Sequence, residues 1–434
     1  PLPAEVTTEI AEHYDVVIVG GSTAALAAAF TSAEEGAKTA LLEPTDWIGG
    51  QLTASGVPAV DEAWHRIVDD VTGKVVLDVS AIARDPRNMT PFFRDALAKI
   101  GNPGKGWVSR YCFEPKRLLE ESLLPREKSL ATHLTVFRNT VIKSVEVDRA
   151  NRQITSLTAI QRTAVNADEM GKYDRLLSED LPDWYSREAS TRYSKKVLKF
   201  SKSDYEPTIF IDATEWGELL ALSDAAYLVG VDDSITNDQD AEESKAQPYG
   251  QAVTFGFVQR YNAEPAKEHP KHAKVENLGY GSYRDKPNAW PLIWTYRRLL
   301  AESKEPSPGD LSLQNWGFDS NTGESGNDYA DGYLFLSKQA TADQVDNWQG
   351  GVGLEVLAAA ERQAFAWHDW FRNAAPKDID PNCITIEGAV LGTTHGLSKV
   401  PYIRDTRRSI GLDNFLIHAS DLTGPAGKQT GTKF

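Results

Sequence analysis

The sequence has 434 residues, 41% of them apolar and 25% charged, which is typical of a globular protein with two or three domains. Its net charge of −16 argues against non-specific binding to nucleic acid, which needs positive surface to neutralise phosphates. The two cysteines cannot form a disulfide framework or a cysteine-based metal site, and no apolar run reaches the ~20 residues of a membrane span.

The first predicted elements form a strand–helix–strand unit. A short apolar run over 14–20 predicts a buried parallel strand, because a strand covered on both faces needs no polar alternation. The alanine-rich stretch over 22–35 contains no proline and stops at Gly36, which predicts a helix. A second short strand is predicted over 39–43. Together these segments predict one βαβ unit of a parallel sheet.

The turn between this strand and helix has the pattern of a dinucleotide-binding loop, written G-x-S-x-x-A. It consists of Gly20, Gly21, Ser22, Thr23, Ala24 and Ala25. Gly20 suits the tight turn, and the small residues that follow let the backbone approach a pyrophosphate and the helix pack on the strand. The phosphates would lie at the positive end of the helix. Glu43, at the end of the second strand, stands where a carboxylate accepts hydrogen bonds from an adenosine ribose. A generic βαβ unit with a chance acidic residue is the alternative.

Further along the chain, alternating apolar residues over 134–164 predict a hairpin around Asp148–Asn151. The polar stretch over about 165–202 predicts a surface insertion, and Thr208–Asp212 predicts a return to a buried strand. From 241 to about 332 no clean period is present, which we interpret as most of a second, substrate-facing domain. Apolar residues at helical spacing over 354–372, with Pro376 just beyond, predict a long helix.

Two later segments resemble parts of flavoproteins. After Glu43 comes a glycine-containing loop that resembles the one crossing the FAD diphosphate, with Gly49, Gly50, Gln51 and Thr53. The stretch PTIFIDATEWGEL over 207–219 resembles the strand and loop that re-enter the cofactor domain, with Ala213 and Thr214 at the turn. Glu215 stands where glycine is common in this class. A simple NAD dehydrogenase would instead continue with regular βαβ units.

Six ordered motifs resemble those of the FAD-dependent oxidoreductase family: GGSTAALAAA, WIGGQLTASGV, RYCFEP, IFIDATEWGELLAL, GNDY and VPYIRDTRR. The resemblance implies FAD as the cofactor and an α/β fold, in which a glutathione-reductase-like FAD-binding domain is combined with a mixed-sheet α+β substrate domain. It predicts a discontinuous FAD-binding domain over 1–240, a substrate domain over 241–380, and a return to the FAD domain over 381–434.

Candidate catalytic residues concentrate between 387 and 408. His395 is a candidate general base, and a loop histidine bonded to backbone is the alternative. Arg404 is a candidate for fixing an anionic substrate or the flavin's developing negative charge, and a structural ion pair is the alternative. Tyr402 completes the catalytic set. His65 follows the glycine pair closely enough to be a candidate for covalent attachment of flavin.

The expected function is oxidation of a small organic substrate by hydride transfer to FAD. The alternatives are a flavin monooxygenase or halogenase, or a non-catalytic FAD-binding subunit of a larger redox complex. Flavoproteins of this class usually close with a glycine- and aspartate-containing segment and a long helix, and the sequence ends at Phe434 where that segment would begin. We therefore expect a second polypeptide to complete the FAD domain, with truncation or a real shortening of the protein as the alternatives.

Overall fold

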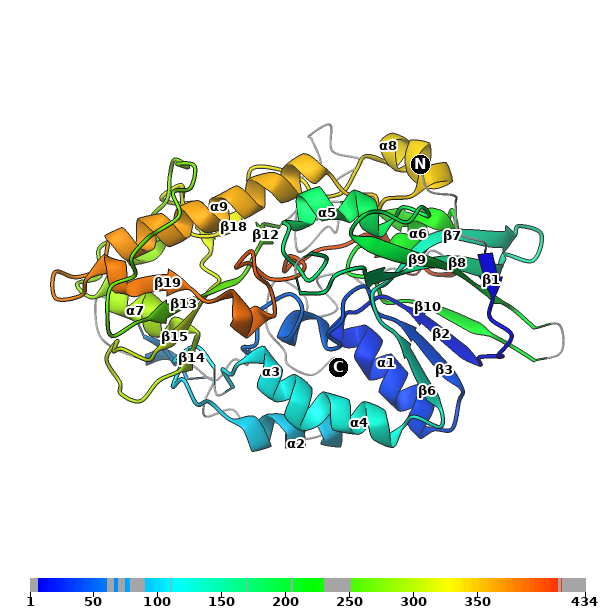
Figure 1. Ribbon diagram of the computed structural model, residues 1–434, viewed down its shortest axis with the longest axis horizontal. Coiled ribbons are helices and arrows are strands. Elements are labelled where there is room, and N and C mark those ends of the chain that lie inside the picture. Colours follow the sequence, from blue (N-terminus) through cyan, green and yellow to red (C-terminus); the bar gives the residue numbers. More distant parts are fainter. Residues whose placement is uncertain are drawn as a thin grey trace.

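The computed structural model divides into two halves joined by long connections (Figure 1). One half holds the parallel sheet and a neighbouring mixed sheet, and the other holds an antiparallel sheet covered by α9 (Leu354–Asn373). No helix among the described residues is long and apolar enough to cross a membrane. The structure describes residues 7–60, 66–68, 75–78, 90–109, 111–168, 170–203, 206–229, 251–412 and 415.

The parallel sheet has the strand order β10-β2-β3-β6. Its strands are β2 (Val16–Val19), β3 (Thr39–Leu42), β6 (Leu134–Phe137) and β10 (Ile209–Asp212). All four residues of β2 and of β3 are buried, as the apolar runs predict. Helix α1 (Thr23–Glu34) connects these two strands, so the predicted βαβ unit is confirmed. β10 lies at the edge of the sheet, and its Ile209 is 59% exposed, so this strand is less buried than the sequence predicts.

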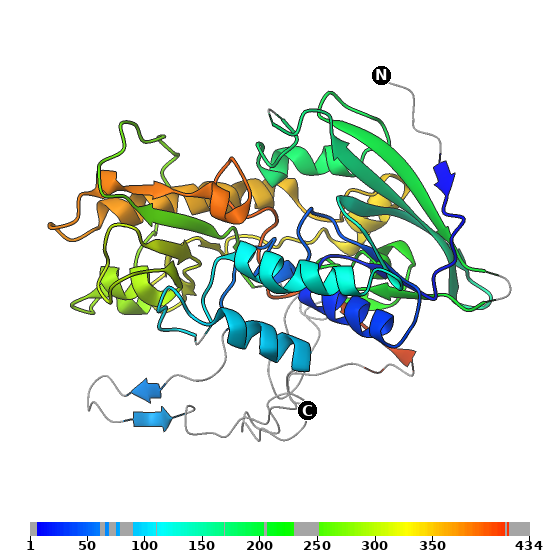
Figure 2. The ribbon, with the colours of Figure 1, turned by 60° about the horizontal axis from the view of Figure 1, so that its bottom comes forward.

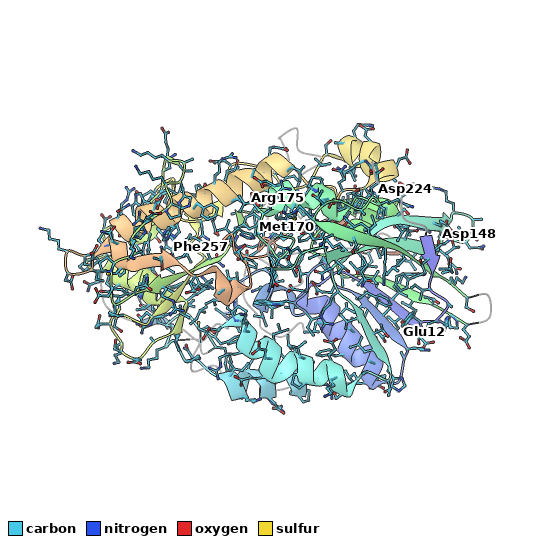
Figure 3. All side chains as sticks on the ribbon, viewed as in Figure 1. Glu12, Asp148, Met170, Arg175, Asp224 and Phe257 are labelled. Atoms are coloured by element: carbon cyan, nitrogen blue, oxygen red, sulfur yellow. The ribbon has the colours of Figure 1, made fainter. Side chains whose placement is uncertain are left out.

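The second sheet of this half has the order β1-β9-β8-β7. Strands β7 (Thr140–Asp148) and β8 (Gln153–Ala164) form the predicted hairpin. Asp148 stabilises its turn, because Oδ1 accepts hydrogen bonds from the backbone N–H groups of Ala150 and Asn151. Figure 3 shows Asp148 at the outer end of this half, far from Phe257 in the other half.

The segment over 165–202, predicted as a surface insertion, is part of the packed fold from residue 177 on. This segment contains α5 (Leu177–Trp184) and β9 (Tyr193–Ser201), and β9 pairs with β8 on one side and β1 (Thr7–Glu9) on the other. The polar composition is misleading because exposed and buried residues alternate in the first half of β9, while Leu198 and Phe200 in its second half are buried on the other face. Even Lys195 is buried, where its ammonium pairs with Asp183 at 3.0 Å.

Phe200 allows a direct test of this correction. Its ring is 3% exposed and lies 5.1 Å from the ring of Phe137 in the parallel sheet. We expect Phe200→Ala to lower the free energy of unfolding by about 3–5 kcal/mol, because it leaves a cavity between the two sheets. Urea denaturation measures this value. Lys196→Ala, at an exposed position of the same strand, is the control and is expected to change it by less than about 0.5 kcal/mol. Equal effects of the two substitutions would contradict the burial of β9.

The other half contains an antiparallel sheet with the order β14-β15-β13-β19. Its strands are β13 (Phe257–Tyr261), β14 (Arg298–Leu300), β15 (Leu311–Gln314) and β19 (Ile384–Ile386). Helix α9 confirms the long helix predicted over 354–372, and on its inner face Trp367 stacks on Trp370 and Phe371.

The boundary predicted at residue 380 needs a correction. β19 follows that boundary but hydrogen bonds to β13, so it belongs to the substrate half. The chain contacts the cofactor half again further on, where β20 (Arg408–Ser409) pairs with β11 (Tyr227–Leu228). A three-residue strand shows no period of its own, and therefore only its pairing reveals where it belongs.

The remaining elements are short. Figure 2 shows the cyan helices α2–α4 lying beside the blue α1. The helices are α2 (Pro91–Ile100), α3 (Pro115–Leu118), α4 (Leu124–Ser129), α6 (Glu218–Leu222), α7 (Ala289–Tyr296) and α8 (Lys338–Gln344). The strands are β4 (Arg66–Val68), β5 (Val75–Asp78), β12 (Val253–Thr254), β16 (Phe318–Asp319), β17 (Glu324–Ser325) and β18 (Asp328–Tyr329).

Candidate functional site

Two adjoining cavities lie at the carboxyl ends of the parallel strands. Ser55, Thr214 and Glu215 line both cavities. β2 ends at Val19 and β10 at Asp212, so the loops that follow these two strands form the floor of both cavities. Ligands of open α/β sheets bind in this position, at the carboxyl edge.

The predicted dinucleotide loop lies at this edge. Gly20 has φ +116°, and a Cβ atom there would lie 2.3 Å from the carbonyl oxygen of Ala213. A Cβ on Gly21 would lie 2.4 Å from the carboxylate of Glu43. Ser22 caps α1, since its Oγ accepts a hydrogen bond from Ala25 N at 3.0 Å and donates one to Ala213 O at 2.7 Å. Residues 22–24 line the second cavity, so the first turn of α1 faces that space.

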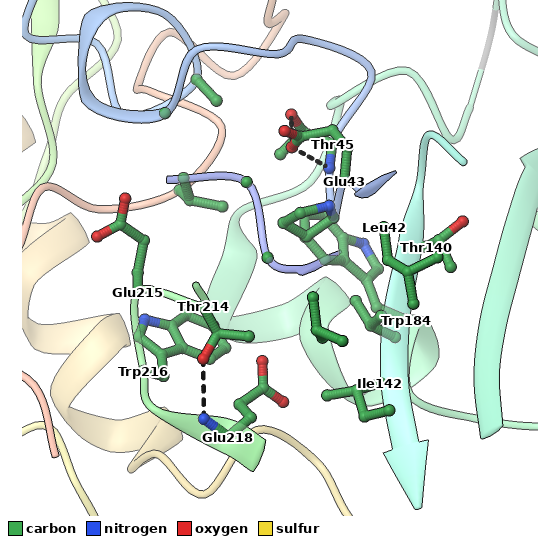
Figure 4. A pocket seen from close by; sticks show the side chains of 18 of the residues that line it. Leu42, Glu43, Thr45, Thr140, Ile142, Trp184, Thr214, Glu215, Trp216 and Glu218 are labelled. Carbon is green, nitrogen blue, oxygen red and sulfur yellow. Dashed lines mark hydrogen bonds between the residues drawn. The ribbon is translucent and has the colours of Figure 1, made fainter. Parts of the chain in front are cut away.

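Glu43 is buried in the wall of the first cavity, as Figure 4 shows. Its Oε1 accepts hydrogen bonds from Thr45 N at 2.9 Å and Thr45 Oγ1 at 2.8 Å. Its Oε2 has no hydrogen-bond partner among the described residues. Burial raises the pKa of this carboxyl to about 8. A buried acceptor without a partner is costly, so the geometry fits a ligand with hydroxyl groups, such as the ribose of an adenosine.

The residues of the loop after Glu43 have two different roles. Gly50 packs against the dinucleotide loop, because a Cβ there would lie 2.6 Å from the backbone nitrogen of Thr23, and Gln51 lines the second cavity. Gly49 has φ +114°, and Thr53 is buried with its Oγ1 bonded to the carbonyl of Ile48 at 2.8 Å. These last two residues shape the loop and are not among the residues that line either cavity.

The re-entrant segment is built around Asp212. Its Oδ1 accepts hydrogen bonds from Thr214 N at 3.0 Å and Thr214 Oγ1 at 2.7 Å, and its Oδ2 accepts one from Leu220 N at 3.1 Å. These bonds hold the turn that brings Ala213 into the second cavity and Thr214 into both. Burial raises the pKa of Glu215, at the junction of the cavities, to about 7.

Tyr402 and Arg404 line the second cavity together, opposite the first turn of α1. The Arg404 guanidinium lies 4.7 Å from the centre of the Tyr402 ring. Its Nη1 donates to the carbonyl of Ala252 at 3.0 Å, and its Nη2 pairs with Asp328 at 2.9 Å. Arg404 and Asp328 also line a third cavity, between loops of the substrate half.

His395 is not among the residues that line these three cavities. Its Nδ1 accepts a hydrogen bond from Leu397 N at 3.1 Å, and burial lowers its pKa to about 4. The ring is therefore neutral at pH 7 and bonded to backbone, which matches the alternative interpretation from the sequence. The structure thus brings Tyr402 and Arg404 together but leaves His395 apart. His65 lies outside the described residues.

Sequence reasoning missed several residues of the first cavity. Trp184 and Tyr185 come from α5, in the segment interpreted as an insertion, and Trp216 and Glu218 come from the re-entrant segment. A buried lysine also supports the cofactor loop: the Lys399 ammonium pairs with Asp46 at 3.1 Å and lies over two aromatic rings, those of Trp47 and Tyr173. A signal was available, since the IFIDATEWGELLAL and VPYIRDTRR motifs contain or adjoin Trp216, Glu218 and Lys399.

Comparison with known proteins gives a family match. A family described as FAD dependent oxidoreductase matches residues 15–169 and 188–424, which is most of the chain. No curated protein matches the sequence.

Three solved structures illustrate the range of similar folds. GidA from Aquifex aeolicus is 21% identical over 35% of this chain and 23% of its own, with a TM-score of 0.23. The flavin-dependent monooxygenase PieE, solved with FAD and substrate, is 13% identical over 58% of this chain and 35% of its own, with a TM-score of 0.28. L-Amino acid deaminase from Proteus myxofaciens is 9% identical over 61% of this chain and 55% of its own, with a TM-score of 0.25. The chain spans less than two thirds of each of these proteins, and such scores add no argument to the family match.

Proposed function

The chain belongs to the FAD-dependent oxidoreductase family, and we propose that it oxidises a small organic substrate by hydride transfer to FAD. The observation that carries this proposal is the position of Arg404, which lines both the second cavity and the third cavity. Residues of the cofactor half form much of the second cavity, and residues of the substrate half form most of the third. A substrate in the third cavity would therefore meet the cofactor at Arg404.

The positions of these residues along the two cavities support one orientation of the bound FAD. Glu43, whose Oε2 has no hydrogen-bond partner in the part of the chain that the structure describes, would hold the adenosine ribose in the first cavity. The first turn of α1, with Ser22 and Gln51 beside it, would hold the diphosphate, because unpaired N–H groups and the helix dipole attract anions. The flavin ring would then lie toward Tyr402 and Arg404. When bound, FAD supplies the two-electron acceptor for the reaction.

Arg404 acts in this proposal as a fixed positive charge. The guanidinium is held by Asp328 and the carbonyl of Ala252, so it needs little reorganisation when negative charge develops beside it. It would orient an anionic group of the substrate or stabilise charge on the reduced cofactor.

Rapid mixing under argon tests the proposal. A panel of amines, alcohols and compounds with oxidisable C–C bonds is added to the FAD-loaded protein, and loss of flavin absorbance is recorded. We expect at least one class to reduce the flavin without NADH or NADPH. We expect Arg404→Gln to slow that reduction by about 100-fold, as for loss of other preorganised charge-stabilising donors.

Arg260→Gln is the matched control. Arg260 pairs with Glu387 at 2.7 Å in the substrate half but is not among the residues that line the three cavities. Its rate of reduction should stay within about twofold of the wild type, in line with the small value of exposed ion pairs. Reduction only by NADH or NADPH would overturn the proposal in favour of a monooxygenase, and equal effects of the two arginine substitutions would remove Arg404 from it.

A further inference from the structure

The third cavity lies in the substrate half, at the end of β15 (Figure 1). The described residues that line it are five aromatic residues, two arginines, two aspartates, two asparagines, two serines and two glycines, with no aliphatic side chain among them. Pockets for apolar ligands are lined mostly by hydrophobic side chains with few polar groups. This lining combines aromatic rings with many hydrogen-bonding groups, so it suits a ligand that has both apolar faces and several polar groups.

The side-chain amide of Asn315 has no hydrogen-bond partner among the described residues, although the residue is only 7% exposed. Side chains alternate along an extended chain, and the preceding Gln314 is bonded to Trp367 of α9 at 3.0 Å. Asn315 therefore points away from α9, to the side where the cavity lies. A buried amide without a partner is costly, and an amide can both donate and accept, as a hydroxyl group can.

Asp319 adds an acceptor to the same cavity. Its Oδ1 accepts hydrogen bonds from Asn321 N at 2.8 Å and Thr322 N at 3.3 Å. No described residue donates to its Oδ2 or forms an ion pair with it. An ionised carboxylate can only accept, so the group that meets Oδ2 must be a donor. Hydroxyl and ammonium groups both meet this requirement.

The charges of the lining separate these two possibilities. Its two arginines balance its two aspartates, and Asp328 is paired with Arg404 at 2.9 Å. The guanidinium of Arg297 lies 4.5 Å from the centre of the Tyr296 ring, so a cation already contacts that aromatic residue. An ammonium ligand needs an excess of negative charge or free aromatic faces, and a carboxylate ligand needs an excess of positive charge. The balanced lining favours a neutral ligand whose donors are hydroxyl groups.

The aromatic residues provide the apolar part of the site. Phe318 is 47% exposed, and its ring packs against no other aromatic ring among the described residues. Tyr283 and Tyr296 pack edge-on against Trp316 at 5.2 and 5.3 Å between ring centres, which fixes the wall beside it. A pyranose ring carries C–H groups on its faces and hydroxyl groups around its edge. It therefore matches an exposed ring next to an amide and a carboxylate.

We propose that the third cavity binds a neutral pyranose unit, with Asn315 and Asp319 on its hydroxyl groups and Phe318 against its C–H face. The inference rests on the proposed function only in taking this cavity as the substrate site. It specifies the class of ligand and adds no step to the reaction. With a neutral substrate, the role left to Arg404 is stabilisation of charge on the reduced cofactor.

Saturation-transfer NMR on the FAD-loaded protein under argon tests this inference. The probes are the methyl α- and β-pyranosides of glucose, galactose and mannose. They are compared with methoxycyclohexane, which has a six-membered ring but no hydroxyl groups, and with cyclohexanecarboxylate and tetramethylammonium. We expect at least one methyl pyranoside to bind the wild type at least tenfold more tightly than each of the three comparison compounds. This comparison needs no variant to fold.

Variants place the binding in the third cavity. Asn315→Leu keeps the approximate shape of the side chain but removes its hydrogen bonds, so the pyranoside should bind about tenfold more weakly. Phe318→Ala should weaken binding about fivefold. Asn373→Leu, at an exposed position that ends α9 outside this cavity, is the matched control and should stay within about twofold of the wild type.

Three results would overturn the inference: no methyl pyranoside binds, a comparison compound binds as tightly as the best pyranoside, or the two asparagine variants have equal effects. Flavin absorbance is recorded in the same samples. A pyranoside that binds as expected supports the inference whether or not it reduces the flavin. Reduction of the flavin by an amine, with no pyranoside bound, would overturn this inference and leave the proposed hydride transfer intact.

Discussion

Protein with valine in place of Gly20 is expected to contain less than about one tenth of the FAD bound by the wild type. The backbone of Gly20 has φ +116°, where a β-branched residue is strained, and its Cβ would lie 2.3 Å from the carbonyl oxygen of Ala213. Strain and overpacking each cost about 1–3 kcal/mol, so the loop must move away from the cavity. Flavin absorbance of the purified protein, relative to its protein absorbance, measures the retained cofactor.

Gly36 provides the matched control at the other end of α1. It also has a positive φ, +89°, but a Cβ there would have no heavy atom within 4 Å. Gly36→Ala is therefore expected to cost only about 1–2 kcal/mol of stability and to leave the FAD content unchanged. If Gly20→Val keeps its full FAD content, the diphosphate site does not depend on the close approach of Gly20 to the loop at Ala213.

Glu43→Ala is expected to weaken FAD binding by about 1–3 kcal/mol, or roughly 5- to 150-fold in the dissociation constant. The substitution removes the acceptor that Oε2 offers and leaves the bonds of Thr45 unmade. Titration of the FAD-free protein with FAD, followed by quenching of flavin fluorescence, gives the constant. Glu43→Gln, which keeps one acceptor oxygen, should lose less affinity than Glu43→Ala. Wild-type affinity in Glu43→Ala would remove Glu43 from the ribose site.

The same residue has a consequence for stability in the absence of FAD. The pKa of Glu43 is raised from 4.5 to about 8 in the folded protein, so between these values the folded state binds more protons than the unfolded state. The contribution of Glu43 to the free energy of unfolding therefore falls as pH rises from 4.5 to about 8. Urea denaturation of Glu43→Gln should show a smaller fall over this range. An unchanged pH profile would contradict the burial of an unpaired carboxyl.

Local signals were enough to predict the βαβ unit of the cofactor half and the turn between its first strand and its helix. Two short apolar runs are enough to predict β2 and β3, and the small residues over 20–25 are enough to predict the loop between β2 and α1. Gly50 and Gln51 were predicted from the family resemblance. In the structure Gly50 packs against the loop over 20–25, and Gln51 lines the second cavity.

The rest of the site depends on contacts between residues far apart in the sequence. Asp328 and Arg404 are 76 residues apart, and no local pattern indicates that they pair. Trp184 and Tyr185 were missed because the polar residues around them suggested a surface insertion, whereas both side chains are buried in the core of the structure. The second polypeptide expected after Phe434 stays a prediction.

An experimental structure of the FAD-loaded protein tests the central claim most directly. We predict the adenosine in the first cavity, with ribose hydroxyls within hydrogen-bond distance of Glu43, the diphosphate at the first turn of α1, and the flavin ring beside Tyr402 and Arg404. A flavin ring in the first cavity, with the adenosine at Arg404, would contradict both the assignment of the two cavities and the proposed meeting of substrate and cofactor.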